Sequence, residues 1–271
     1  MVILSTTALR SANIETLPMA LTDEIVQCLE SKAPNVWEVI QRAPAVDYEF
    51  VANDTSPTLM IEGMHLTSSY DRSFEAFHQA ERIDRDEKKA TVYGFGLGDI
   101  VRELLSRNTV DRVDVVVMNP SITRLSLTLF DHSDWLSDDR VSLHLGEAHA
   151  TPSEPYTLSP VCVKLASDSN RELAKVILER QEEELPPVEE LIDALEIAAL
   201  SYIHAVDKQA SGYLVQFIDM LTEVLSNGQP EETIRGFMEI VSVTVRAQER
   251  QDFLLVADFL LYEFRPAIAA D

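Results

Sequence analysis

The sequence is short of positive charge. Lys and Arg total 22 against 46 Asp and Glu, and the formal net charge is −24. A field of this sign repels phosphate backbones and anionic lipid, so neither nucleic acid nor a membrane surface is expected as a partner. No apolar run approaches the ~18 residues that span a bilayer. The N-terminal residues also lack the basic leader and apolar core of a signal peptide. We therefore expect a cytoplasmic protein.

Cysteine is scarce as well. Cys28 and Cys162 lie far apart in the chain, each among apolar residues, and neither belongs to a CxxC or Cys/His cluster. This usage excludes a disulfide framework and predicts two small buried hydrophobic side chains in a reducing compartment.

Patterns that carry catalysis are missing too. Among six histidines no pair has the HxxxH or HExxH spacing of a helical metal site, so no metal is expected. His144 and His149 flank Glu147 and, with Asp131, His132 and Asp134, are candidates for a polar rim. No GxSxG, no GxxxxGK[ST] and no nucleophile–base pair occurs. No catalytic residue is therefore assigned.

The most informative stretch of the sequence is residues 88–120. A β-branched run at residues 90–92 ends in Tyr93 and meets three glycines, Gly94, Gly96 and Gly98. A helical pattern follows, and a second apolar run, residues 113–118, comes after a polar connection. Strand, glycine turn, helix and strand form a βαβ unit, and a fully apolar second strand is typical of a parallel sheet covered on both faces.

The surrounding sequence predicts three regions. Residues 1–65 read as a small α+β segment, with a helix from Thr22 that stops at Pro34, a short helix at residues 36–40, and a hairpin of residues 48–52 and 58–62. Residues 66–185 form the Rossmann-like domain, with a third strand at 141–145 and a Pro- and Ser-rich loop at 151–160. Residues 161–165 fit either a short strand or the lead into a helix that spans residues 167–183. Pro186 and Pro187 mark a boundary, and residues 186–271 read as a helical bundle.

The bundle pattern contains helices at residues 188–207 and 213–225, and a third segment from Pro230 to Leu261 that is one long helix or two. The acids Asp252, Asp258 and Glu263 fall on mixed faces of its last part. We interpret them as an ordinary polar helix surface. The predicted fold class is α/β, with a methyltransferase-like parallel sheet between the N-terminal segment and the bundle.

The glycine turn is the candidate binding site. Gly94, Gly96 and Gly98, with Phe95 between them, would let the backbone approach a ligand at the carboxyl end of the first strand. The spacing matches a methyltransferase-type GxGxG better than GxGxxG, which needs a small residue where Asp99 stands. Glycines that serve only strand-to-helix packing are an equal alternative.

Two further residues complete the candidate cofactor site. A methyltransferase-type site has an acid at the end of the second strand to accept hydrogen bonds from a ribose. Asn119 holds that position here without a charge. Glu147 follows the third strand, where adenine-contacting acids occur in such sheets, although a lone acid at a strand end is more often only solvated.

Several blocks resemble one known family. Residues Ser68-Ser69-Tyr70-Asp71, Glu75-Ala76, 93–98 and 137–141 resemble the N-terminal domain of bacterial motility accessory factor (Maf) proteins, which assist flagellin glycosylation. In that family a Glu-Pro pair stands where this chain has Asn119-Pro120. The family's larger central domain, which is MptE-like and resembles sialyltransferases, is thought to carry the transferase chemistry and is absent here. The resemblance implies a Rossmann-like accessory domain and does not carry glycosyl transfer onto this chain.

The sequence thus predicts an accessory protein related to the motility factors, with a nucleotide-type cleft. One alternative is an S-adenosylmethionine-dependent methyltransferase that uses residues 94–98, Asn119 and Glu147, since such an enzyme needs little beyond positioning. Another is a protein-interaction module with a vestigial cleft. The cofactor is open between S-adenosylmethionine and a nucleotide. The C-terminal helices are the candidate surface for a protein partner or a homodimer.

Overall fold

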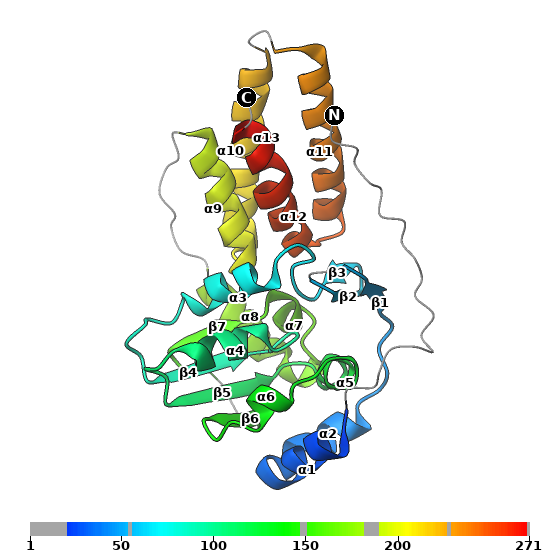
Figure 1. The fold of residues 1–271 in the computed structure, drawn as a ribbon, viewed down its shortest axis with the longest axis vertical. Coiled ribbons are helices and arrows are strands. Elements are labelled where there is room, and N and C mark those ends of the chain that lie inside the picture. Colours follow the sequence, from blue (N-terminus) through cyan, green and yellow to red (C-terminus); the bar gives the residue numbers. More distant parts are fainter. Residues whose placement is uncertain (1–20, 54–55, 147–150, 182–189, 227–228, 270–271) are drawn as a thin grey trace.

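The computed structural model describes residues 21–53, 56–146, 151–181, 190–226 and 229–269. Figure 1 shows a helical bundle standing on an α/β part, with the longest helices pointing away from the sheet. The predicted boundary at Pro186 and Pro187 lies outside the described residues. No helix within the described ranges has the length and apolar character needed to cross a membrane.

The N-terminal helices form where the sequence predicts them. Thr22 caps the first helix by accepting a hydrogen bond from the Ile25 N–H at 3.3 Å. Pro34 begins the second helix, where its missing N–H costs nothing. Both helices turn apolar residues, including Trp37, toward the sheet core. The two helices are α1 (Asp23–Lys32) and α2 (Pro34–Arg42).

The predicted hairpin is present and gains a third strand. Glu49 pairs with Met60 in an antiparallel register, and Ile61 pairs with Met64 across a tight turn. The turn residues Glu62 and Gly63 both have positive φ, which closes a two-residue connection. The strands are β1 (Glu49–Val51), β2 (Thr58–Ile61) and β3 (Met64–His65), and the helix α3 (Arg72–Ala80) follows with Asp71 as its N-cap.

The central sheet has four parallel strands in the order β6-β5-β4-β7. The first strand of this sheet, β4, therefore lies between its second, β5, and its fourth, β7. This is the arrangement of half a Rossmann sheet. The α/β, Rossmann-like fold class predicted from the sequence is confirmed. The elements are β4 (Lys89–Tyr93), α4 (Asp99–Ser106), β5 (Arg112–Val117), α5 (Pro120–Leu129), α6 (Ser133–Leu136), β6 (Val141–Leu145) and β7 (Tyr156–Leu158).

The prediction of a loop over residues 151–160 is wrong in its last part. Residues Tyr156, Thr157 and Leu158 form β7, an edge strand that pairs with β4. Three residues are too few to show strand periodicity. Residues after it form a short helix and not a strand, because Pro160 starts a helical turn. These elements are α7 (Pro160–Lys164), the 3-10 turn η3 (Asp168–Asn170) and α8 (Arg171–Arg180).

The two faces of the sheet bury different side chains. Val92, Val113 and Val115 point into a core shared with α1, α2, α4 and Trp135 of α6. Tyr93 and Val116 point to the opposite face, where α7 and α8 cover them. Because successive strand residues alternate between faces, continuous apolar runs are what a doubly covered sheet requires.

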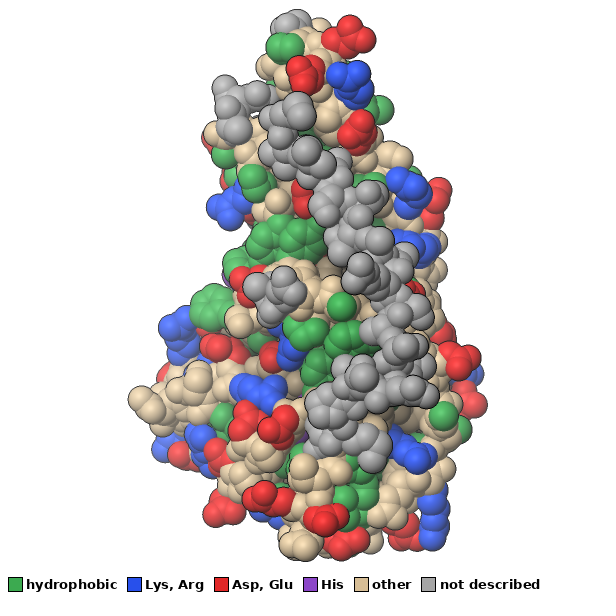
Figure 2. All heavy atoms as spheres, turned by 45° about the vertical axis from the view of Figure 1, so that its right-hand side comes forward, with side chains coloured by type: hydrophobic (Ala, Val, Ile, Leu, Met, Phe, Trp, Pro, Cys, Tyr) green, Lys and Arg blue, Asp and Glu red, His purple; other side chains and the backbone are tan. Residues whose placement is uncertain are grey.

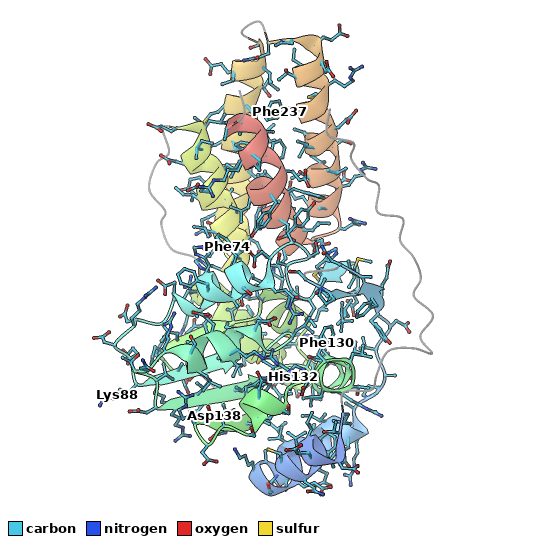
Figure 3. All side chains as sticks on the ribbon, viewed as in Figure 1. Phe74, Lys88, Phe130, His132, Asp138 and Phe237 are labelled. Carbon is cyan, nitrogen blue, oxygen red and sulfur yellow. The ribbon has the colours of Figure 1, made fainter. Side chains whose placement is uncertain are left out.

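The C-terminal helices share one core with the β1–β3 sheet. Leu59, Ile61 and Leu66 pack in the same cluster as Phe217 and Phe264 of the bundle. The long third segment predicted from the sequence is two helices, separated by a turn in which Gln251 has φ of 60°. The elements are α9 (Leu191–Ile203), α10 (Asp207–Ser226), α11 (Glu231–Glu249), α12 (Phe253–Phe259), the π-helical turn η4 (Leu260–Phe264) and α13 (Arg265–Ala269). Figure 3 shows Phe237 between the helices of the bundle and Phe74 where α3 meets it.

Candidate functional site

The glycine turn after β4 has the backbone shape that its sequence predicts. Gly94, Gly96 and Gly98 have φ of 68°, 56° and 89°. Residues with a Cβ atom rarely adopt these backbone conformations. Gly98 is the N-cap of α4. Two of the turn's N–H groups already have backbone partners, since Gly94 donates to the Val116 carbonyl at 2.9 Å and Gly98 to the Phe95 carbonyl at 2.7 Å.

The space around this turn is filled by the chain itself. A Cβ atom added to Gly94 would lie 2.2 Å from the Cβ of Cys162, and one added to Gly98 would lie 2.6 Å from Nε1 of Trp135. Beside Gly96 there remains a cavity of about 10 Å³, which is room for about one water molecule. Ser159 borders that cavity, and its buried Oγ has no hydrogen-bond partner among the described residues. Phe95 is 3% exposed and packs on His132 and Trp135.

Residues 159–170, the crossing segment, cover the carboxyl ends of the strands. Ser159 donates its N–H to the Tyr93 carbonyl of β4, and Ser167 donates to the Met118 carbonyl beyond β5. The Nδ2 of Asn170 donates to the carbonyls of Val117 and Met118 at 3.1 and 2.9 Å. Asn170 also packs on Gly146 after β6, where an added Cβ would lie 2.4 Å from its Oδ1. The segment thus contacts the ends of β4, β5 and β6 after leaving β7.

Asn119 lies at the end of β5, as predicted, but both ends of its amide are engaged. Its Oδ1 accepts hydrogen bonds from the N–H groups of Ser121 and Ile122, which caps α5. Its Nδ2 donates to the Leu165 carbonyl at 2.5 Å, which holds the crossing segment. The side chain therefore joins two elements and presents no free oxygen toward the turn. Glu147, the sixth predicted binding residue, lies outside the described residues.

Asp99, the acid at the start of α4, is neutralised by a neighbouring arginine. Arg72 donates to both carboxylate oxygens at 2.8 Å and also to the Pro57 carbonyl. Arg72 itself lies over the Phe130 ring. This bidentate pair closes the turn from the side of α3.

The histidine rim predicted from the sequence is not formed by His132. This side chain is fully buried between α5 and α6, where Trp135 donates to its Nδ1 at 3.0 Å and Ser126 lies at 3.1 Å from its Nε2 (Figure 3). Burial lowers the pKa of His132 to about 4, so the ring is neutral. His144 instead pairs with Asp114 at 3.1 Å, and His149 lies outside the described residues.

Two carboxyl groups converge on Ser68, and we call Ser68, Glu75 and Asp258 the Ser68 cluster. The Ser68 N–H donates to Oε2 of Glu75 at 2.6 Å, and the Ser68 hydroxyl donates to Oδ1 of Asp258 at 2.6 Å. Burial raises the pKa of Glu75 to about 8 and that of Asp258 to about 6. Burial of the two carboxyl groups so close together therefore favours proton uptake by the cluster.

The interpretation of the last acids as a polar helix surface is wrong. Asp252 and Asp258 are 1% and 3% exposed. Asp252 accepts from the His65 backbone N–H at 3.0 Å and lies 2.6 Å from its ring Nδ1. Glu263 accepts from the Tyr70 hydroxyl at 2.8 Å. These acids bind the loop before α3 to the bundle. The sequence signal was their position on otherwise apolar turns, where a solvated acid is not expected.

A large open cleft lies between α2 and α8, and we call it the α2–α8 cleft. It has a volume of about 1340 Å³ and is floored by apolar residues such as Pro44, Pro120 and Leu165. Its rim carries acids and bases, most of them in pairs. Lys164 lies 2.7 Å from Asp207, and Lys175 lies 3.9 Å from Glu179. The charged lining residues are Glu38, Arg42, Glu62, Lys164, Asp168, Arg171, Lys175, Glu179, Asp207 and Lys208.

The cleft lies on the outer side of the crossing segment. Asn119 and Ser121 line it from the end of β5 and the start of α5, and Ser167 and Ser169 line it from the crossing segment. Its size is sufficient for a nucleotide-sized ligand. The cleft is balanced in charge, with five acids and five bases, in a chain whose net charge is −24. No group of three potential metal ligands occurs among the described residues.

The similarity of this chain to known proteins assigns it neither a family nor a function. No family model matches the chain, and no curated protein matches it. A crystal structure of spermidine synthase in complex with the transition-state analogue AdoDATO is similar, with a TM-score of 0.31 and 14% sequence identity. The similarity covers 48% of this chain and 51% of that chain, so this chain spans about half the length of that protein.

Proposed function

We propose that this protein is a non-catalytic accessory protein, as its resemblance to the motility accessory factors implies, and that it acts by binding. The observation that supports this most directly is the crossing segment over the carboxyl edge of the sheet. Cys162 of that segment fills the position beside Gly94 where a cofactor would approach the backbone.

The dimensions of the turn also favour this proposal. Pockets for small ligands typically enclose roughly 300–1,000 Å³, whereas the cavity beside Gly96 measures about 10 Å³. Asp99 would face a pyrophosphate, and its charge is already satisfied by Arg72. A nucleotide at the turn would have to displace Cys162, Ser159 and that ion pair together.

The ligand of such an accessory protein would be a polar small molecule in the α2–α8 cleft. An anionic group of the ligand would replace the acid that pairs with Lys175 or Arg171. The apolar residues of the lining would contact a ring or an alkyl chain of the ligand. The test is a thermal melt with and without a panel of S-adenosylmethionine, S-adenosylhomocysteine and sugar nucleotides. A ligand at 100 times its dissociation constant adds about 2.7 kcal/mol, which is several degrees.

Matched variants locate the ligand. The expected result is a shift that Lys175→Glu reduces and Arg180→Glu does not, since Arg180 lies on the same helix and does not line the cleft. Hydrogen exchange of residues 159–170 should not become faster with the ligand, because a ligand in the cleft contacts this segment from outside without displacing it. If no compound in the panel shifts the melt, the cleft is not a site for this class and the binding proposal fails.

A second candidate, a methyltransferase, is favoured by one specific observation. The strand order β6-β5-β4-β7 places a glycine turn at the end of the first strand, next to the point where the order reverses. In this reading α7 must move away to admit S-adenosylmethionine. Binding of that cofactor with faster hydrogen exchange in residues 159–170, and methyl transfer to an acceptor, would replace the accessory proposal.

The motility role remains the part of the proposal that depends on the resemblance alone. It predicts that deletion of the gene in a flagellated host lowers the glycan mass carried by flagellin. Intact-mass spectrometry of purified flagellin measures this directly. An unchanged glycan mass would contradict the motility role, and the accessory proposal would then stand without it.

A further inference from the structure

The helices α10 and α11 leave an apolar groove between them, the α10–α11 groove. Leu214, Val215 and Ile218 line it from α10, and Val241 and Val245 line it from α11. The space measures about 200 Å³. Thr244, Gln248 and Asp219 supply the remaining, polar part of the lining.

The two helices are packed on one side only. Over the 19 residues of α11, the buried side chains are Phe237, Thr244 and Ala247, which face the bundle. Of the residues that line the groove, Val215 is 59% exposed and Val245 42%, and Met238, seven positions before Val245 on α11, is 56% exposed. In Figure 1, the C-terminal end of α10 and the N-terminal end of α11 extend beyond the rest of the bundle, and the groove lies in the other half of α11, toward its end near β3. Exposed apolar surface gathered on one element marks an interaction site.

Acidic residues border the groove. Asp219 lines it, and Glu223 lies one turn further along the same face of α10. Glu249 lies one turn beyond Val245 on α11. These three acids are exposed, and none forms an ion pair with another described residue. The basic residues Arg235 and Arg246 of α11 are eleven positions apart and therefore share another face of that helix.

We infer that the α10–α11 groove binds a basic amphipathic helix of a partner protein. An apolar helix face fits into such a groove, and Lys or Arg on its flanks would meet Asp219, Glu223 and Glu249. A second copy of this chain is the poorer occupant, because it would place the same acids opposite one another and bring together two chains of net charge −24 each. None of the residues that line the α10–α11 groove lines the α2–α8 cleft, so the inference holds whether or not that cleft binds a ligand.

Figure 2 shows that acidic and basic side chains are otherwise interspersed over the visible face, with hydrophobic side chains gathered mainly near the junction between the bundle and the α/β part. At the junction itself, Tyr70 of the loop before α3 and Tyr262 of η4 stack with 5.3 Å between ring centroids. The α10–α11 groove has no such internal explanation among the described residues.

The test uses a fluorescein-labelled 18-residue peptide with Leu on one helical face and Lys on the other, titrated with the full chain in fluorescence anisotropy. A scrambled peptide of the same composition and a Leu/Glu peptide are the ligand controls. We expect saturable binding of the Leu/Lys helix that weakens with salt. Val245→Lys and Asp219→Lys should each weaken it at least tenfold.

Val224→Lys is the matched control, because Val224 is 44% exposed on α10 and does not line the groove. It should change binding less than twofold. Equal weakening by Val224→Lys, or equal binding of the scrambled peptide, would reduce the effect to net charge and overturn the inference. A dimer in sedimentation equilibrium that Val245→Lys dissociates would assign the groove to a second copy instead.

Discussion

Cys162 lies against Gly94 so closely that a methyl group at position 94 would come within 2.2 Å of the Cys162 Cβ atom. This contact joins the end of the first central strand to the short helix that follows the fourth. Because of this contact, a glycine turn with the shape of a ligand-binding turn instead packs β4 against α7.

The first prediction follows from this contact. Gly94→Ala should destabilise the protein by about 2–4 kcal/mol, because it combines a steric overlap with a positive φ. The double variant Gly94→Ala/Cys162→Gly should recover part of the loss, since only the overlap is relieved. Urea denaturation measures both. If Gly94→Ala has the same urea midpoint as the wild type, α7 does not pack against the glycine turn.

Substitution of two glycines elsewhere in the chain should have the opposite effect on stability. Gly212 in α10 and Gly236 in α11 have nothing within 4 Å of an added Cβ, and both lie inside helices. Replacement of either by Ala should therefore raise stability by about 0.5–1 kcal/mol. A loss at these positions in the same denaturation assay would contradict the helices described here.

A third prediction concerns the crossing segment. Asn170→Ala removes two hydrogen bonds to the carbonyls of Val117 and Met118, which should cost about 1–3 kcal/mol. Hydrogen exchange of residues 160–170 should become faster while that of β4 and β5 changes less. Ser169→Ala is the control, because Ser169 is exposed. Equal exchange in the two variants would show that Asn170 does not hold the segment.

The Ser68 cluster gives a pH dependence with a definite sign. The folded pKa of Glu75, about 8, lies above its ordinary value of 4.5. The folded state therefore binds the proton more tightly than the unfolded state, and stability falls as pH rises between 4.5 and 8. Asp258 acts in the same direction between pH 3.8 and about 6.

Buried histidines act in the opposite direction at lower pH. Burial lowers the pKa of His132 and of His204 to about 4, so stability rises with pH between about 4 and 6.5. The two effects oppose one another up to pH 6.5, and above it Glu75 acts without them. We expect the melting temperature to fall from pH 6.5 to 8, and Glu75→Gln to flatten this slope. A slope that persists in Glu75→Gln would assign it to other groups.

The last prediction concerns the contact between His65 and Asp252. Asp252→Ala leaves the His65 backbone N–H and ring nitrogen without their partner in a buried place, which should cost about 2–4 kcal/mol. Glu249→Ala, an exposed acid nearby in sequence, should change stability by less than about 0.5 kcal/mol. Similar losses in both variants, measured in urea, would contradict a specific role for Asp252.

Local patterns in the sequence were sufficient for the central unit of the fold. The continuous apolar runs of β4 and β5 and the glycines at 94, 96 and 98 are patterns within a few neighbouring positions. Cys162 was likewise predicted to be buried, and it is, whereas Cys28 is half-buried and donates its Sγ–H to the Leu136 carbonyl.

Contacts between residues far apart in the chain could not be predicted from the sequence. The pairing of His65 with Asp252 joins positions 187 apart, and Asn119 contacts Leu165 across 46 residues. The apolar turns around Asp258 indicate burial, but they do not identify its partner Ser68, which lies 190 positions away. For the same reason the sequence predicted the glycine turn but not the segment that fills it.

The crossing segment also has a consequence for synthesis of the chain. The strands of the central sheet are all made once residue 158 has been added, yet the ends of β4, β5 and β6 stay uncovered until Asn170 follows. At about 5–20 residues per second, this interval lasts on the order of one second. A nascent chain stalled within it would present Tyr93, Val116 and Met118 to chaperones, although all three are buried in the finished protein.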